Sequence, residues 1–306
     1  MGAGIMIDWI KQWIPRPQQR RLQDLRLSLR FPLARLRGLP DFLVIGAQRC
    51  GTSSLYKYLE RHPQVYASIR KETEYLSTAY SNGELWYRSH FPFNLRMSMG
   101  ARLRGTKSKA FEATPDYMLD PRAPERASDL LPEVRLIALV RNPVDRAYSH
   151  YLHNRRLNQE QLSFEDALDA EPERIEGEVA RLLEDPSYQA RSLRRYSYVT
   201  RGRYAEQIER WHARFSPDSL LIVHSEALFS SPANGFARVL EFLGLEPWQP
   251  RRFENFSYRH FAGKPSPSAK PETRQRLSIV FKTPNACLYE LIKADLGWEG
   301  EPDDGG

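Results

Sequence analysis

The chain has 306 residues, 41% of them hydrophobic and 27% charged, which is ordinary for a soluble globular protein with one large α/β domain or two small ones. Its net charge of +7 gives no argument for a nucleic-acid partner, because residues 1–40 alone hold eight Lys and Arg against Asp8 and Asp24. Two cysteines, Cys50 and Cys287, exclude a disulfide scaffold, and no stretch approaches the ~20 apolar residues that span a bilayer.

Residues 1–40 are predicted to form a basic, amphipathic N-terminal extension. Within it, GIMIDWIKQWI is too short and too polar for a membrane helix and lacks a secretory cleavage site. Its apolar and basic residues suit peripheral contact with an anionic membrane surface. The other interpretation is a packed or frayed extension, because Pro15 and Pro17 break any long helix. We expect a cytoplasmic protein whose N-terminal arm could contact the inner membrane surface peripherally.

The apolar run at residues 42–46, FLVIG, predicts a buried strand, and an amphipathic helix pattern follows it. Between them, Gly46 and Gly51 bracket a tight turn with four residues between the glycines. This spacing lets the backbone N–H groups of Gln48 through Ser53 converge on an anion at the helix N-terminus. A plain strand-to-helix turn is the alternative.

The turn differs from a Walker A loop, because Thr52 stands where a nucleotide triphosphatase carries its lysine. This argues against a magnesium triphosphate and favours a smaller anion. Arg49 offers it a guanidinium, and Thr52 and Ser53 offer hydroxyls. Cys50 would be reactive if the site lowered its pKa; the other interpretation is a small residue that fits the turn.

Residues 64–67 and 109–112 predict short strands, and the run at 134–140 predicts a further buried one. Asn142 is the expected N-cap of the next helix, with Pro143 at its first position. Arg141 lies at the carboxyl end of the strand, where ligands bind in open α/β sheets, and Ser149 follows about two turns into the helix. The pair could hold a second phosphate; a surface salt bridge and a solvated serine are the alternative.

Residues 162–200 are acidic and charged, which predicts a helical insertion or lid. A strand is expected at 220–224, between helices that begin at Tyr204 and at Ser231-Pro232. Residues 253–271 predict a long ordered loop before C-terminal helices. Alternating strands and helices predict an α/β, P-loop-like three-layer fold in which helices flank a central parallel sheet, with one domain over residues 41–306.

Together these segments resemble the sulfotransferase superfamily, and most closely its heparan sulfate and carbohydrate branch. GAQRCGTSSL resembles the family's 5′-phosphosulfate loop, and RNPVDRAYSHY resembles its 3′-phosphate motif. KETEYLS from Lys71, FEATPDYM from Phe111 and RGRYAEQIERW from Arg201 are similar to further segments of that branch. The resemblance extends from about residue 41 to the end of the chain.

The resemblance implies transfer of a sulfuryl group from 3′-phosphoadenosine 5′-phosphosulfate to an acceptor hydroxyl, favouring a glycan, with release of adenosine 3′,5′-bisphosphate and without a metal. It also implies which residues bind this donor: Gln48, Arg49, Cys50, Gly51, Thr52, Ser53, Arg141, Ser149 and, as further candidates, Tyr204 and Lys264. The scattered histidines show no metal-ligand spacing.

For catalysis, the resemblance implies Glu72 as the base and Arg49 as the group that stabilises developing charge. Glu112 and His150 are the alternative bases, and Lys71 is a candidate for balancing the cleft's charge. Three positions depart from many relatives: Arg49 replaces a lysine, Glu74 a histidine and Ala113 a lysine. They concern the acceptor more than the donor.

Two other functions stay open. A P-loop kinase or nucleotide triphosphatase would carry a lysine in the first loop and an aspartate at a strand end for magnesium. A non-catalytic nucleotide-binding protein could keep the same scaffold. The presence of Arg49, Glu72, Arg141 and Ser149 together favours an enzyme.

Overall fold

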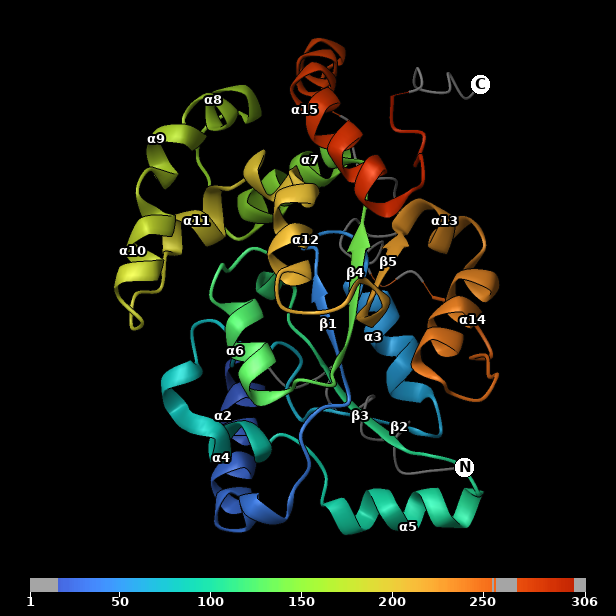
Figure 1. Ribbon diagram of the computed structural model, residues 1–306. Helices are drawn as coiled ribbons and strands as arrows, with labels where there is room; N and C mark the ends of the chain where they lie inside the picture. Colours follow the sequence, from blue (N-terminus) through green and yellow to red (C-terminus); the bar gives the residue numbers. More distant parts are fainter. Residues whose placement is uncertain (1–15, 255, 257–268, 300–306) are drawn as a thin grey trace.

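A computed structural model describes residues 16–254, 256 and 269–299. Its strands form one parallel sheet in the order β2-β3-β1-β4-β5 (Figure 1). The strands are β1 Phe42–Gly46, β2 Val65–Ala67, β3 Lys109–Ala113, β4 Arg135–Val140 and β5 Leu220–His224. All five predicted strands are confirmed to within one residue at each end. The expected α/β fold with a central parallel sheet is therefore confirmed.

Burial explains why the central strands were legible in the sequence. Every residue of β1 is buried, as are five of the six residues of β4. Parallel strands covered on both faces need near-continuous apolar runs. Across the sheet Val44 pairs with Ala113 on one side and Ile137 on the other, so β1 lies at its centre. The loops after β1 and β4 consequently leave the same edge of the sheet side by side.

Helices surround this sheet, with α3 packed against β1 and α14 against β5. Figure 1 shows α8 to α11 grouped together, apart from the sheet. The helices are α2 Arg16–Arg30, α3 Thr52–Arg61, α4 Gly83–Arg88, α5 Asn94–Arg104, α6 Ala123–Leu130, α7 Pro143–Arg156, α8 Phe164–Asp169, α9 Glu171–Ile175, α10 Glu178–Glu184, α11 Arg191–Tyr196, α12 Tyr204–His212, α13 Ser225–Ser230, α14 Pro232–Leu243 and α15 Pro271–Ile292. A short 3₁₀ helix, η1 (Phe31–Leu36), follows α2, and η3 (Pro115–Met118) follows β3.

The expected start of α7 is confirmed, and a glycine sets the end of α14. The Asn142 side chain accepts hydrogen bonds from the backbone N–H groups of Val144 (3.0 Å) and Asp145 (3.4 Å), which starts α7. Gly244, with φ of 62°, ends α14 in the left-handed conformation that glycine tolerates best.

The terminal regions differ from expectation. Pro17 does not prevent a helix, because it lies in the first turn of α2, where no intrahelical N–H is lost. The C-terminal region forms one helix of 22 residues with Pro284 inside it, rather than several helices. The segment GIMIDWIKQWI and most of the loop predicted at 253–271 lie outside the described residues. Among the helices that the structure describes, none combines the length and apolarity needed to cross a membrane.

Candidate functional site

The loop between β1 and α3 is held in one shape by contacts on several sides. Gly51 has a φ of 92°, and a Cβ atom there would lie 2.6 Å from the Phe229 ring. The Cys50 carbonyl accepts a hydrogen bond from Ser225 Oγ at 2.6 Å. The Cys50 N–H donates to the Ala47 carbonyl at 3.3 Å. Position 51 therefore requires glycine, both for its backbone angle and because a side chain there would collide with Phe229.

The amide donors of this loop are fewer than the spacing predicted. The N–H groups of Ser54 and Leu55 donate to the Gly51 carbonyl, at 3.0 and 3.2 Å, as the first intrahelical bonds. The amides of Thr52 and Ser53 precede these bonds, which is where a helix presents donors to an anion. The N–H of Cys50, which was predicted to point at the anion, instead donates to the Ala47 carbonyl within the turn. It therefore does not converge with the amides of Thr52 and Ser53.

Arg49 joins this loop to the second predicted motif. Its Nε donates to Oγ of Ser149, at 3.1 Å, and Ser149 is a buried residue of α7. Burial, and after it the positive charges of Arg156 and Arg141, lowers the pKa of Arg49 to about 10. Within the described part of the chain, no carboxylate forms an ion pair with Arg49 or Arg141. Crowded guanidinium groups without a counter-charge are the electrostatic signature of an anion site.

Arg146 adds charge to this region, and the sequence analysis missed it. Its side chain is fully buried, with Nη2 donating to the Tyr198 carbonyl. Its Nε and Nη1 have no hydrogen-bond partner among the described residues. The signal was present as the second arginine of RNPVDRAYSHY, but the sequence could not show that this residue faces inward from α7.

Tyr204 and Cys50 are both buried and pack beneath the backbone of Arg141 and the loop between β1 and α3. Tyr204 is 1% exposed; its hydroxyl donates to the Arg141 carbonyl at 2.8 Å and lies 3.6 Å from Cys50 Sγ. The burial of Tyr204 favours a packing position, while its place in the donor pocket stays a prediction. Burial raises the pKa of Cys50 to about 11, which favours a small residue that fits the turn over a reactive thiol.

A third segment, residues 71–74, reaches the same helix end. Lys71 Nζ donates to Ser53 Oγ at 2.8 Å and lies 3.3 Å from Glu72 Oε1. The ammonium missing from the loop is therefore supplied by another part of the chain. Glu72 keeps 47% of its side chain exposed, while its N–H is held by the Ala113 carbonyl at 3.1 Å.

Three of the six non-glycine residues with positive φ among the described residues lie in these segments. Arg49, Glu72 and Glu74 have φ values of 71°, 65° and 56°, a left-handed conformation that costs non-glycine residues free energy. Such conformations persist where surrounding contacts impose them, and they cluster at functional sites. The strain and the hydrogen bonds both locate the candidate site where the loop, α7 and residues 71–74 meet.

The alternative bases are both buried. Glu112 is 0% exposed and accepts hydrogen bonds from four hydroxyls, those of Thr73 (2.5 Å), Tyr87 (2.7 Å), Tyr117 (2.8 Å) and Thr114 (2.9 Å). This arrangement fixes Thr73 beside Glu72 but leaves no room for an acceptor. His150 is 1% exposed and its ring lies 4.9 Å from that of Tyr198. Burial holds the pKa of His150 well below its usual range, so it packs as a neutral ring.

Glu74 links the site to the helical insertion. Arg194 of α11 forms ion pairs with Glu74 at 2.8 Å and with Asp116 at 2.7 Å. Arg201 forms a further ion pair with Asp116 at 2.7 Å. Residue 74 therefore has a structural partner where relatives were expected to carry a histidine. Lys264, the last predicted donor ligand, lies outside the described residues. Across the ranges that the structure describes, no cluster of His, Cys, Asp and Glu is arranged to hold a metal ion.

Comparison with known proteins identifies similar chains. The family model described as "Sulfotransferase domain" matches residues 39–268. Heparan sulfate glucosamine 3-O-sulfotransferase 3A1 of Mus musculus is 28% identical over 281 residues, covering 86% of this chain and 65% of that protein. Bifunctional heparan sulfate N-deacetylase/N-sulfotransferase 4 of Mus musculus is 33% identical over 218 residues, covering 68% of this chain and 23% of that protein.

Among solved structures, a sulfotransferase from Alicyclobacillus acidocaldarius superimposes with a TM-score of 0.61 at 26% identity. The match covers 86% of this chain and all of that one. The match thus covers the full length of this solved bacterial structure, whereas the chain spans only 65% of the 3-O-sulfotransferase relative.

Proposed function

This chain belongs to the sulfotransferase domain family, and from that premise we propose that it transfers a sulfuryl group from 3′-phosphoadenosine 5′-phosphosulfate to a hydroxyl of a carbohydrate or glycoconjugate. The hydrogen bond between Arg49 and Ser149 carries the proposal, because it brings the two predicted phosphate motifs to one site. The heparan sulfate enzymes among the similar proteins support a glycan acceptor.

The donor is assigned to the two anion-binding segments. Arg49 and the first-turn amides of Thr52 and Ser53 would hold the 5′-phosphosulfate, and Arg141 and Ser149 the 3′-phosphate. Two separate groups of donors suit a nucleotide that carries phosphates on both its 3′ and 5′ sides. The hydrogen bond from Arg49 to Ser149 makes the two groups of donors neighbours.

The proposed reaction is an in-line displacement at sulfur. The acceptor oxygen forms a bond to sulfur while the bond from sulfur to the 5′-phosphate oxygen breaks, and that oxygen keeps the electron pair. Glu72 takes the proton of the acceptor hydroxyl. Arg49, Lys71 and the loop amides stabilise the negative charge that develops on the leaving phosphate and the sulfuryl oxygens. Lys71 is suited to this role because its ammonium group donates to Ser53, in the first turn of α3.

Binding of adenosine 3′,5′-bisphosphate in EDTA, measured by isothermal titration calorimetry, tests the donor assignment. We expect binding without metal, tighter than that of ATP measured with magnesium. Tighter binding of ATP with magnesium would favour the kinase alternative. Transfer of labelled sulfate to a panel of glycans and glycolipids tests the acceptor. Donor binding with no transfer to any acceptor in cell extracts would favour the non-catalytic alternative.

A further inference from the structure

Exposed apolar side chains gather in two segments of this protein. Of the 15 large hydrophobic residues that are exposed in the described chain, nine lie within residues 22–36 and 95–103. The exposed fractions reach 72% at Leu29, 71% at Leu95 and 85% at Leu103. Single exposed leucines need no explanation, but a group of this size on adjoining elements marks an interaction surface.

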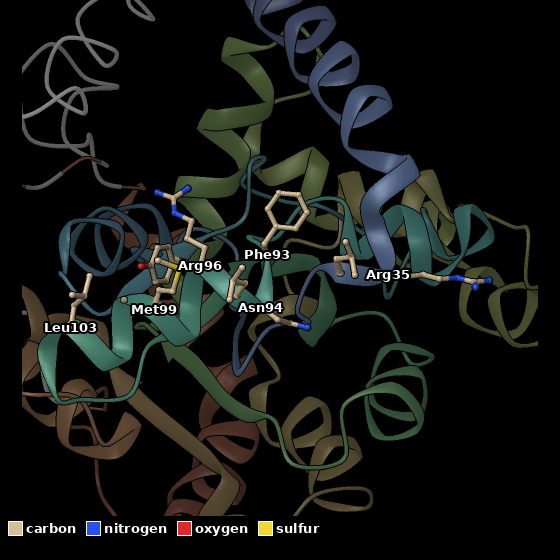
Figure 2. A pocket seen from close by; sticks show the side chains of 10 residues that line it. Arg35, Phe93, Asn94, Arg96, Met99 and Leu103 are labelled. Carbon is tan, nitrogen blue, oxygen red and sulfur yellow. The ribbon is translucent and has the colours of Figure 1, made fainter.

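The two segments share a cavity of about 740 Å³ (Figure 2). Arg35 and Leu36 of η1 line one side, and α5 lines the other; Tyr66 and Phe93 also border it. The lining residues from α5 are Asn94, Leu95, Arg96, Met99, Gly100 and Leu103. In Figure 2 the Arg35 side chain extends at one end of the labelled residues and Leu103 lies at the other, with the Arg96 guanidinium between them.

Helix α2, directly before η1, has the same character. Leu22, Leu25 and Leu29 recur at i, i+3 and i+7 and are all exposed, whereas Leu27 points to the opposite side and is 4% exposed. The helix therefore packs through Leu27, and no other described residue covers its leucine stripe. Its one acidic residue, Asp24, pairs with Arg70 at 2.5 Å.

Positive charge accompanies the leucines. Residues 16–37 carry seven Arg and one Asp, and residues 93–109 carry three Arg, two Lys and no acidic residue. These segments sum to +11, so the other residues of the chain sum to −4, given the total of +7. The net positive charge of the protein thus lies in the segments that expose apolar side chains.

We propose that α2, η1 and α5 form a docking surface for an anionic lipid bilayer. Leucines that protrude beside arginines match the two parts of a membrane interface, acyl chains below and anionic headgroups above. A nucleic acid would use the arginines but leave the leucines in water. Helix α2 and η1 belong to the N-terminal extension, residues 1–40, for which membrane contact was predicted, and α5 adds a segment that was not predicted.

Helix α5 lies at the opposite end of the sheet from the loop between β1 and α3, whereas α2 reaches Arg70, next to Lys71 of the candidate site. Helix α5 ends at Arg104 and leads into the start of β3 at Lys109. The loop between β1 and α3, which is assigned to the sulfate donor, follows the carboxyl end of β1. Figure 1 shows α5 beyond one end of the sheet and the tip of β4 pointing toward α7 at the other.

Vesicle sedimentation of the full chain tests this proposal. Vesicles of phosphatidylcholine alone are compared with vesicles that also contain phosphatidylglycerol. We expect binding to the anionic vesicles only. The triple substitution Arg35→Gln, Arg96→Gln, Arg102→Gln should weaken this binding about 100-fold, since each basic residue contributes about 1 kcal/mol at such a surface. The triple substitution Leu95→Ser, Met99→Ser, Leu103→Ser should weaken it at least about tenfold.

Matched controls carry the same changes elsewhere on the surface. Leu157→Ser, Leu183→Ser, Ile279→Ser removes three other exposed apolar side chains, and Arg238→Gln, Arg251→Gln, Arg252→Gln removes three other exposed arginines. Equal loss of vesicle binding in the controls, or no binding by the unaltered protein, would overturn the proposal. Self-association that the leucine variant abolishes, measured by analytical ultracentrifugation without vesicles, would assign the surface to a second copy of the chain. Sedimentation needs no donor or acceptor, so its outcome is independent of the proposed reaction.

Discussion

Arg49 Nε donates a hydrogen bond to Ser149 Oγ at 3.1 Å, although the two residues stand 100 positions apart. Arg49 follows β1, and Ser149 lies in the helix after β4. Because β1 and β4 are neighbouring parallel strands, both segments leave the same edge of the sheet. One contact thus makes a single anion site from two motifs that are each weak signals alone.

Removing either partner should weaken donor binding. For Ser149→Ala we expect about tenfold weaker binding of adenosine 3′,5′-bisphosphate, the cost of one hydrogen bond to a charged group. Arg49→Gln should cost about 100-fold, because it removes the charge as well. Isothermal titration calorimetry in EDTA measures both. The control is Ser278→Ala, on the exposed surface of α15, which should bind normally. Unchanged affinity in both site variants would place the nucleotide elsewhere.

Glu72→Gln should lower the rate of sulfate transfer by about 10² to 10⁴-fold, the range for loss of a general base. Donor affinity should stay unchanged, because Glu72 is assigned to the acceptor proton. Transfer of labelled sulfate under single-turnover conditions, with donor titration alongside, separates the two effects. Glu241→Gln, an exposed residue of α14, is the matched control. A fall in donor affinity without a fall in rate would mean that Glu72 positions Lys71 and is not the base.

Gly51→Ala should destabilise the fold by about 3 kcal/mol, because alanine tolerates a φ of 92° poorly and its Cβ would meet Phe229. Gly244→Ala separates these causes, since its φ is 62° but no atom lies within 4 Å of the added Cβ. We expect about 1 kcal/mol there. Urea unfolding measures both. Equal losses would show that the Phe229 collision relaxes without cost.

Glu112 should make stability depend on pH. Burial raises its pKa above the ordinary 4.5, although four hydroxyl hydrogen bonds oppose this shift. The folded state then holds the proton at pH values where the unfolded state has lost it. Its contribution to stability is therefore complete below about pH 4.5 and is lost as pH rises through the folded pKa.

The comparison with Glu112→Gln, which does not titrate, isolates this effect. The free energy of unfolding of the unaltered protein, relative to that of the variant, should be lower at about pH 8 than at about pH 5. Urea unfolding at the two pH values measures the difference. A difference of opposite sign would mean that the hydroxyl network outweighs burial and lowers the pKa of Glu112.

The two cysteines should differ in reactivity. Cys50 is buried and its pKa is raised to about 11, while Cys287 is exposed. Iodoacetamide at about pH 8 should therefore modify Cys287 alone in the folded protein, since the thiolate is the reactive form. Intact-mass spectrometry counts the added groups, and denatured protein should gain two. Fast modification of Cys50 in the folded protein would restore the reactive-thiol interpretation.

The positions of the strands could be predicted because burial on both faces imposes a local pattern. Residues 42–46 and 220–224 match β1 and β5 at both ends, as continuous apolar runs. The start of α7 was predictable for a similar reason, since Asn142 caps it by bonding its own neighbours. Helix α2 was missed because Pro17 was taken as a breaker without regard to its place in the first turn.

Local pattern thus determines, in this protein, the strands, the helix ends and the phosphate-type loop, since each depends on residues close together in the chain. The order of the strands decides which side chains meet, and that order arises from packing between distant segments. It brings Lys71 to Ser53 and buries Arg146. It also encloses Glu112 among four hydroxyls, although the sequence alone admitted that residue as a base. These pairings depend on contacts across the sheet, which no window of neighbouring residues contains.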